Sequence, residues 1–517
     1  MVVNTFSLPP SEEVIDPVKE GRDPNYSWTK KVTSFKTMPP MSPALRVQKW
    51  LVRHGLFLLL PALLQPAFLT AQGSFTNSGG EYPVSGPLNG EQTFPSTAFN
   101  SSGGWVVWQD NGIDGSGLGI GARRLDAGLN PAGPALRINK IAAGDQEQPH
   151  VALLNNGGAV AVWQGGRQGF QNVYARFLGG DGSFASDDIL VNAPAFSSST
   201  RVTTNWLVFR SNHARYRTQR IKQIVDVKLE RTGGPAVTSL TDGTVVVAYT
   251  SGRKVSTNSQ AMVHKFKWNG LRYITNSVLQ FVPSSDDTMQ DVYFQLFTAG
   301  GQKVGGEIRA NQSLPFNQRS PALAALADGS FVLVWAADRP AGLNSTIEIV
   351  ARRFDHNGGP LDNESVVNTS GNPCANPSVA AIPGGGFTVA WTQHEGANKQ
   401  DVFARTFNSS AQPITTGFVL NTERRGEQHT PQVAATSGGQ LVVWTSLSQD
   451  GSREGVYGRW LNDGLIVSPE FRVNTTRHLR QFTPAVATDG GSRALVIWSS
   501  YQTAAGFDLF GQRYIAP

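Results

Sequence analysis

From Gly103 onward the chain repeats one pattern of apolar and polar positions. Its clearest element is a run of mostly β-branched residues that ends in an aromatic side chain. Seven such runs occur, ending at Trp108, Trp163, Tyr249, Trp335, Trp391, Trp444 and Trp498. Successive ends are 53 to 56 residues apart in four intervals and 86 apart in the other two. A unit of about 54 residues with two insertions accounts for this spacing.

Each unit contains four strand-like segments in a fixed order. The first follows a proline, as in PQVAAT from Pro431, and the second is the aromatic-ended run. The third resembles NVYARF from Asn172, and the fourth ends near an asparagine, as in FVLN at Asn421. Short strands and glycine-rich turns at this period are typical of propeller blades, whereas a sandwich would need a closed core in every repeat. The pattern predicts an all-β, seven-bladed β-propeller.

The two ends of the repeat region complement each other. The last unit stops at QRYIAP after three strands, and the segment from Glu81 to Pro95 matches the missing fourth strand and the linker after it. We therefore expect an N-terminal strand to complete the last blade, which closes the ring and leaves no unpaired sheet edge.

Composition agrees with a sheet-rich chain that is not cross-linked. The sequence has 55 Gly, 30 Pro, 12 Trp and 16% charged residues, as expected for short strands, tight turns and an aromatic core. A single cysteine, Cys374, excludes an internal disulfide, so stability must come from buried apolar surface. The eight histidines form no metal-protease motif, and those beside linkers, such as His150 and His429, are expected to be solvated.

The N-terminal region is read as a targeting segment. Residues 1–40 are predicted to be a disordered or spurious extension, and residues 41–71 a signal peptide. Arg46, Lys49 and Arg53 precede a short apolar stretch that ends near Leu69, the order found in secretory signals. The propeller then spans residues 72–517, secreted or at the cell surface, with no membrane span in the mature chain. The alternative is a buried or interfacial apolar segment.

Two insertions, at about 195–232 and 253–289, interrupt the third blade. The formal net charge of the whole chain is +6, and the segment Arg201 to Arg231 alone carries this charge. Basic residues here alternate with aromatic ones, which suits acidic glycans or nucleic acid. The candidate ligand-binding residues are Trp206, Arg210, Arg215, Arg217, Arg220, Lys265 and Trp268. The alternative is that the insertions are a disordered loop, or an error in the gene model that includes untranslated intervening sequence.

Aspartates in glycine-rich turns are candidate metal ligands. Asp110 and Asp114 lie in QDNGIDGSG, and Asp450 lies in SQDGSREG. Oxygen-rich flexible loops suit Ca²⁺, but Asp-Gly is also an ordinary turn former, and the blades share no common set of ligands. We therefore expect no cofactor, with Ca²⁺ at these aspartates as the alternative.

The stretch Gly439 to Gly491 resembles the tandem repeats of secreted bacterial proteins. Those repeats combine a VVxW strand, a QDG turn, a VYAxRF strand and an EFxVN segment followed by QxxP. The resemblance covers roughly Gly80 to Pro517 apart from the insertions, and it implies a β-propeller without assigning an activity. Tyr249 in place of Trp and Gln295 in place of the recurring arginine depart from the pattern.

The function expected from these features is binding without chemistry. The recurring third-strand arginines occupy one place in every blade, which favours a structural role over an anion site; they are Arg123, Arg176, Arg352, Arg405, Arg459 and Arg513. No sialidase-type Asp box occurs, and no pair of carboxylates stands out as a glycosidase would require. We expect a monomeric, non-enzymatic extracellular binding or adhesion module for a protein or carbohydrate, without nucleic acid as partner. The alternatives are a secreted glycan-active hydrolase or lyase with a site at the channel mouth, and a structural element of an envelope or matrix.

Overall fold

The computed structural model describes residues 75–516, apart from 168–170, 194–197, 212–213, 258, 269–272, 283–286, 314–315, 342–343, 397–398 and 504–505. Side chains are further limited, because those at 198–231, 253–289, 340–345 and 502–503 are not described. The predicted extension 1–40 and signal peptide 41–71 lie outside the described residues. Within the described part every regular element is a strand, and no helix there has the length and apolarity to cross a membrane.

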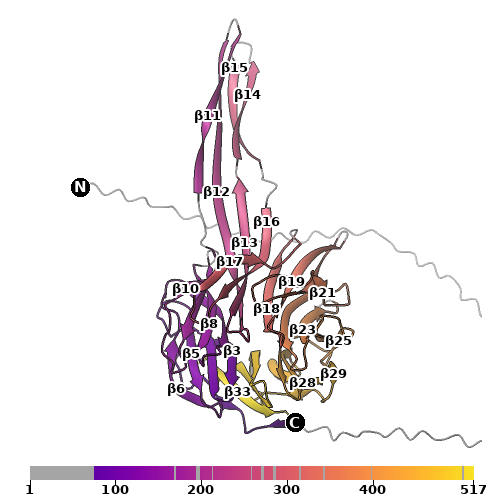
Figure 1. Ribbon diagram of the computed structural model, residues 1–517. Helices are drawn as coiled ribbons and strands as arrows, with labels where there is room; N and C mark the ends of the chain where they lie inside the picture. Colours follow the sequence, from indigo (N-terminus) through magenta and orange to yellow (C-terminus); the bar gives the residue numbers. More distant parts are fainter. Residues whose placement is uncertain are drawn as a thin grey trace, which may run out of the picture. The chain divides into compact units, whose positions relative to one another are not determined.

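Seven antiparallel sheets form the blades of a β-propeller (Figure 1). Blade 1 consists of β3 (Gln92–Asn100), β4 (Gly103–Asp110), β5 (Gly119–Leu125) and β6 (Pro131–Arg137). Blade 2 consists of β7 (Asp145–Leu153), β8 (Ala159–Gly166), β9 (Asn172–Leu178) and β10 (Ile189–Leu190). Blade 3 consists of β12 (Ala214–Ser239), β13 (Val245–Thr257), β16 (Asp287–Phe297) and β17 (Lys303–Arg309). Blade 4 consists of β18 (Gln318–Ala325), β19 (Phe331–Ala341), β20 (Asn344–Phe354) and β21 (Ser365–Val366). Blade 5 consists of β22 (Cys374–Ala381), β23 (Phe387–His394), β24 (Gln400–Phe407) and β25 (Phe418–Val419). Blade 6 consists of β26 (Gln428–Thr436), β27 (Gly439–Leu447), β28 (Glu454–Asn462), β29 (Leu465–Ile466) and β30 (Phe471–Arg472). Blade 7 consists of β31 (Gln481–Thr488), β32 (Arg493–Thr503) and β33 (Gly506–Ile515), together with the N-terminal strands β1 (Thr76–Asn77) and β2 (Tyr82–Pro83).

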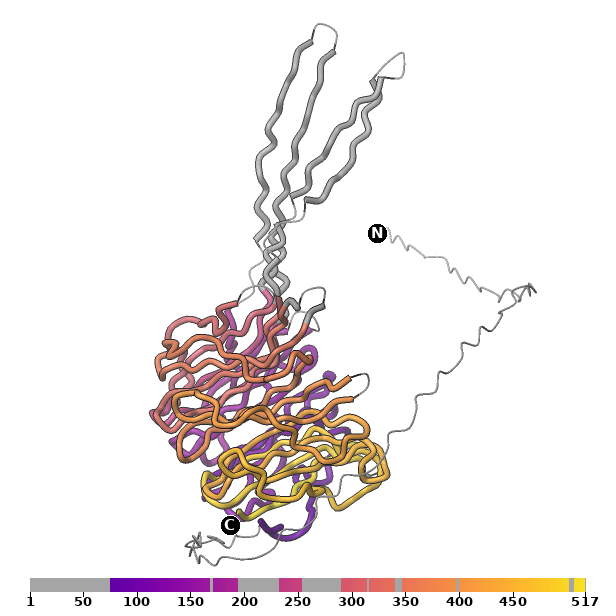
Figure 2. The backbone as a smooth tube through the Cα atoms, turned by 90° about the vertical axis from the view of Figure 1, so that its right-hand side faces the viewer, coloured from indigo at the N-terminus to yellow at the C-terminus, as the bar shows by residue number. Residues whose placement is uncertain are grey.

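The ring closes in the way that the sequences at its two ends predict. The first strand of each blade contacts the first strand of the next, and β3 of blade 1 contacts β31 of blade 7. Strands β1 and β2 pair with β33, with Thr76 opposite Ile515 and Tyr82 opposite Gly511. Figure 2 shows the result, with the yellow C-terminal blade beside the indigo N-terminal part of the ring. The seven-bladed propeller and its N-terminal closing strand are both confirmed.

Seven apolar cores hold the ring together, one between each pair of neighbouring blades. Successive residues of the second strand point to opposite faces of the sheet. Thus Trp105 and Val107 pack against blade 2, whereas Val106 and Trp108 pack against blade 7. Because both faces of each sheet are covered, the second strands are continuous apolar runs rather than alternating ones.

A repeated asparagine completes the short outer strands. Its side-chain oxygen accepts the N–H of a residue near the start of the third strand, at 2.7 to 3.2 Å in all seven blades. The acceptors are Asn139, Asn192, Asn311, Asn368, Asn421, Asn474 and, in the closing segment, Ser85. A side chain therefore supplies a hydrogen bond where the fourth strand is too short to continue the ladder.

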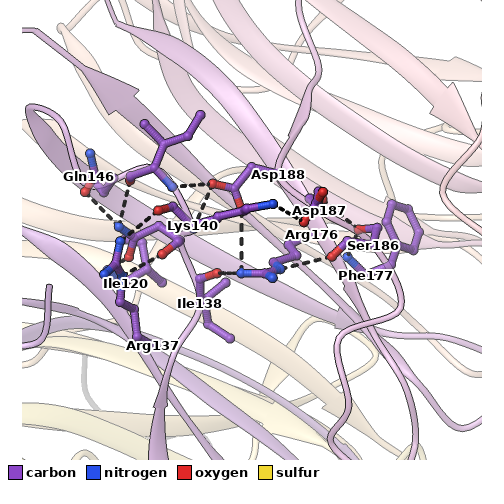
Figure 3. A network of polar contacts seen from close by, with 12 residues as sticks. Ile120, Arg137, Ile138, Lys140, Gln146, Arg176, Phe177, Ser186, Asp187 and Asp188 are labelled. Carbon is purple, nitrogen blue, oxygen red and sulfur yellow. Dashed lines mark hydrogen bonds and ion pairs between the residues drawn. The ribbon is translucent and has the colours of Figure 1, made fainter.

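The recurring arginine joins one blade to the one before it (Figure 3). Arg176 donates to the carbonyl of Ser186 in its own blade and to that of Ile138 in blade 1, while Asp188 accepts the N–H groups of Lys140 and Ile141. Equivalent bonds to the preceding blade are made by Arg123, Arg352, Arg405 and Arg459. Arg176 also pairs with the carboxylate of Asp188 at 3.8 Å. Arg513 departs from the pattern, because it donates to the carbonyl of Leu129 and to Oδ1 of Asn130 in blade 1, the blade after its own. All these bonds agree with the predicted structural role.

Blade 3 lacks this arginine and replaces it with a lysine. Gln295 occupies the arginine position and bonds only within its own blade, to the carbonyls of Leu296 and Val304. Lys303 donates its Nζ to the carbonyl of Val191 in blade 2 at 2.8 Å, the place that an arginine reaches in other blades. Lys303 on the neighbouring strand β17 therefore makes the bond to the preceding blade that Gln295, in place of the arginine, does not make.

The insertions extend the strands of blade 3. Strand β11 (Ser198–Ser211) pairs with β12, and β12 pairs with β13 from Asp226 opposite Thr257 to Ser239 opposite Val245. Strand β14 (Ser259–Trp268) forms a hairpin with β15 (Tyr273–Val282). The side chains of the insertions lie outside the described part, so the binding role predicted for them stays a prediction.

Candidate functional site

A ring of seven bulges surrounds the propeller channel. Each first strand shifts its register just before its proline, and the residue preceding the proline has φ between 48° and 58°. These residues are Phe94, Gln148, Gly234, Ser320, Asn376, Thr430 and Thr483. Proline has no N–H for the ladder, and a bulge accommodates it. All of these residues except Asn376 line one of two adjoining cavities.

The larger cavity is an open polar cleft of about 550 Å³ at blades 2, 3 and 4. Its lining is almost entirely amide, hydroxyl, guanidinium and backbone: Gln148, Gln164, Gln171, Thr232, Gly233, Gly234, Thr250, Gln290, Arg319 and Ser320. The volume lies within the range of small-ligand sites, and the lining supplies many hydrogen-bond donors and acceptors.

The cleft exists because blade 3 carries no side chains at its bulge. Gly233 and Gly234 stand where blade 2 has Glu147 and Gln148. A Cβ on Gly233 would lie 2.2 Å from Oε1 of Gln164, so a larger residue there would displace that side-chain amide. A Cβ on Gly234 would meet nothing closer than 3.9 Å. The space that a side chain fills in the other blades is therefore open at this one.

Two glutamines that line the cleft hold a neighbouring carboxylate, which is not itself a lining residue, in a fixed position. The side-chain amides of Gln164 and Gln171 donate to Oε2 of Glu147 at 2.9 and 2.7 Å. Oε1 of Gln164 accepts the N–H of Gly234 at 3.0 Å. Glu147 is thus held from two sides, by a network that is itself anchored on the backbone of blade 3.

A further lining residue, Arg319, belongs to an ion pair. Arg319 donates from a guanidinium nitrogen to Oδ1 of Asp338 at 2.6 Å, and Asn317 donates to Oδ2 of the same carboxylate at 3.1 Å. The Arg319 side chain is 40% exposed and faces the cleft, whereas that of Asp338 is 18% exposed. The guanidinium compensates the carboxylate charge and keeps donors available to a ligand.

The smaller cavity, of about 270 Å³, lies in the channel beside blades 1, 2, 6 and 7. Phe94, His150, Thr430 and Thr483 line it, and Gln148 lines both this cavity and the cleft. His150 reaches channel water but is enclosed by protein, and this desolvation lowers the pKa of its imidazole to about 4. It is neutral at pH 7. The expected solvent exposure of His150 is found, but the residue lies in strand β7 rather than in a loop.

The three aspartates proposed as metal ligands each accept at least one hydrogen bond in a turn or in the core, and their role as metal ligands stays a prediction. Asp110 accepts from Trp108 Nε1 at 2.9 Å and from the N–H of Gly112 at 2.8 Å. Asp114 and Asp450 accept the N–H two residues ahead, as Asx turns do. Among the residues that the structure describes, no three His, Cys, Asp or Glu side chains gather as metal ligands would.

The cleft residues were missed by the sequence analysis. Glu147, Gln164 and Arg319 belong to no motif, and the predicted insertion residues are not among the lining residues. A usable signal was present in the GGP of blade 3, which stands where other blades have EQP or RSP. Its meaning depends on what the two neighbouring blades place beside it.

Comparison with known proteins gives no family and distant likenesses to solved structures. No protein-family model matches this chain, and a search of curated proteins finds no match. Among solved structures, a protein of unknown function from Dyadobacter fermentans has a TM-score of 0.43 at 12% identity, covering 74% of this chain and 97% of that one. An α-L-arabinanase of Penicillium chrysogenum, complexed with arabinobiose, has a TM-score of 0.41 at 10% identity and covers 86% and 99%. A sialidase of Trypanosoma rangeli has a TM-score of 0.40 at 10% identity and covers 84% and 60%.

The expectation of a non-catalytic binding or adhesion module is contradicted by this comparison. The matched structures include an α-L-arabinanase, a sialidase and a polysaccharide lyase. Sequence reasoning leaned toward binding because it found no pair of carboxylates, and such a pair is assembled from distant blades rather than from one motif. The hypothesis of a non-catalytic binding module is therefore not retained.

Proposed function

We propose that this chain is a secreted glycan-active enzyme, a hydrolase or a lyase, whose substrate binds in the cleft at the channel mouth. The observation that carries the proposal is the cleft itself, an open polar space whose lining residues Gln164 and Gln171 hold Glu147 and whose lining residue Arg319 pairs with Asp338. Secretion through residues 41–71 and a monomeric state belong to the same proposal.

The lining suits a ligand rich in hydroxyl groups. A sugar hydroxyl both donates and accepts, and the side-chain amides of Gln164, Gln171 and Gln290 offer both kinds of partner. Of the described residues that line the cleft, Arg319 alone bears a formal charge, and Asp338 pairs with it. The carboxylate of Glu147 is bonded to the lining residues Gln164 and Gln171, and its negative charge does not favour an anionic ligand. Recognition by hydrogen bonds rather than by net charge favours a neutral saccharide over a polyanion.

The two carboxylates are the candidates for chemistry. Glycoside hydrolysis uses one carboxyl group as a general acid and a second as nucleophile or general base. Glu147 is positioned by two amide donors, and Asp338 by a guanidinium and an amide. We assign them as that pair, with Arg319 positioning both Asp338 and the substrate.

The test is turnover of a polysaccharide panel by the full chain, with reducing ends reporting hydrolysis and ultraviolet absorbance of unsaturated ends reporting lysis. Glu147→Gln and Asp338→Asn keep shape and remove acid–base capacity, and each should lower kcat at least ~100-fold. Wild-type activity on no polysaccharide, or activity that both variants retain, would overturn the proposal.

A matched pair of variants tests the cleft independently of the chemistry. Gly234→Asn places in blade 3 the residue that Asn376 provides at the same backbone conformation in blade 5, so the fold should tolerate it. It should fill the cleft and abolish substrate binding. Asn376→Gly makes the reverse change at the bulge residue that lines neither cavity, and it should leave binding unchanged.

A further inference from the structure

We infer that the channel cavity is a second saccharide subsite, with Phe94 as its aromatic platform, so that one glycan chain occupies the cleft and the channel together. This inference rests on the proposed function, because it assigns a further part of the same substrate-binding site.

The two cavities are neighbours that share one lining residue. Gln148 lines both the cleft of about 550 Å³ and the channel cavity of about 270 Å³. The smaller volume falls below the usual range for an independent ligand site, which starts near ~300 Å³. It suits one added unit of a ligand that is already anchored in the cleft.

Phe94 differs from the other bulge residues. It is 44% exposed, lines the channel cavity, and has φ of 50°. A bulky side chain in the left-handed region is uncommon, and backbone strain of this kind gathers at functional sites. The other six bulge positions carry Gln, Gly, Ser, Asn or Thr, so an exposed aromatic ring here is not required by the repeat.

The rest of the cavity wall selects the class of unit that stacks on Phe94. Thr430, Gln432 and Thr483 supply hydroxyl and amide groups, and the described lining residues include no Asp, Glu, Lys or Arg. A sugar ring has an apolar C–H face that packs on an aromatic face, and hydroxyls at its edge that bond to such side chains. The occupant is therefore a neutral sugar unit of the same chain.

Binding of oligosaccharides of graded length tests this subsite. The probes are arabino-, xylo- and cello-oligosaccharides from disaccharide to hexasaccharide, with dissociation constants for the full chain measured by calorimetry. We expect the wild type to bind at least one series more tightly as length increases. Phe94→Asn, which installs the residue found in blade 5, should weaken the longest member about tenfold and leave the shortest unchanged. Phe94→Tyr should keep the wild-type length dependence.

Two further variants separate the subsite from a change in folding. Thr483→Gln introduces the residue that blade 2 carries at the same bulge position, and it should fill the cavity and remove the gain with length. Leu479→Asn changes another exposed apolar residue of positive φ, outside both cavities, and should bind as the wild type does.

The outcomes distinguish this inference from the proposed function. If the wild type binds no member of any series, both fail. If the wild type binds and Gly234→Asn abolishes binding, but Phe94→Asn and Thr483→Gln keep the full gain with length, the cleft stands and the second subsite is wrong. Equal weakening of all lengths by Phe94→Asn would also overturn the subsite.

Discussion

The outer edges of the blades and the bulge ring around the channel are built from the same seven repeats but use their side chains differently. At the outer edges the same asparagine and the same arginine recur and make the same bonds in nearly every blade. At the bulge ring the backbone recurs, with φ between 48° and 58°, while the side chains differ from blade to blade. A repeated side chain marks structure, whereas a varied side chain on a repeated backbone is available for recognition.

The largest effect is expected at the outer edge. In Asn421→Ala the N–H of Val402 loses its acceptor, and Asp401, whose side chain is fully buried, loses an amide donor. The free energy of unfolding should fall by about 3 kcal/mol, because a buried carboxylate and a buried N–H each lose a hydrogen-bond partner. Chemical denaturation measures the change, with exposed Ser409→Ala as the control. A loss below about 1 kcal/mol would contradict the structural role of the asparagine.

A smaller effect is expected where blade 3 departs from the pattern. Lys303→Met removes the bond to the carbonyl of Val191 and should lower the free energy of unfolding by about 1 to 2 kcal/mol. Adding Gln295→Arg restores the arginine found in the other blades and should recover at least half of that loss. If the double variant is no more stable than Lys303→Met, the two positions are not equivalent.

At the channel the expected effect depends on pH. The pKa of His150 is lowered to about 4 by its enclosure, so between its unfolded value of 6.5 and about 4 the unfolded state binds more protons. Stability therefore falls as the pH drops through this window. The effect is modest because the imidazole reaches channel water. Thermal unfolding of His150→Gln should change less with pH than that of the wild type, and identical pH profiles would be evidence against an enclosed imidazole.

The smallest effect is expected within the bulge ring. Asn376→Ser gives blade 5 the residue that blade 4 carries at Ser320, and the exposed side chain makes no recurring contact. The free energy of unfolding should stay within about 0.5 kcal/mol of the wild-type value. A change as large as that at Asn421 would remove the distinction between the two regions.

Most of the fold could be predicted because its determinants repeat along the chain. The aromatic-ended runs marked each blade, and the strand missing after QRYIAP was found before the first one. The function was predicted less well. The insertion residues from Trp206 to Trp268 drew attention because their charge and aromatic content stand out locally, whereas the cleft residues Glu147 and Arg319 carry no local signal.

The sequence by itself determined the number of blades, the order of their strands and the way the ring closes, because each depends on periodic burial and on pairing between neighbouring segments. Only the tertiary structure decided where the ring is open. The cleft lies where Gly233 and Gly234 of blade 3 stand between Gln164 of blade 2 and Arg319 of blade 4, residues that the packing of three successive blades brings together. A missing side chain becomes a binding site only through what surrounds it, and those surroundings are set by the packing of three blades.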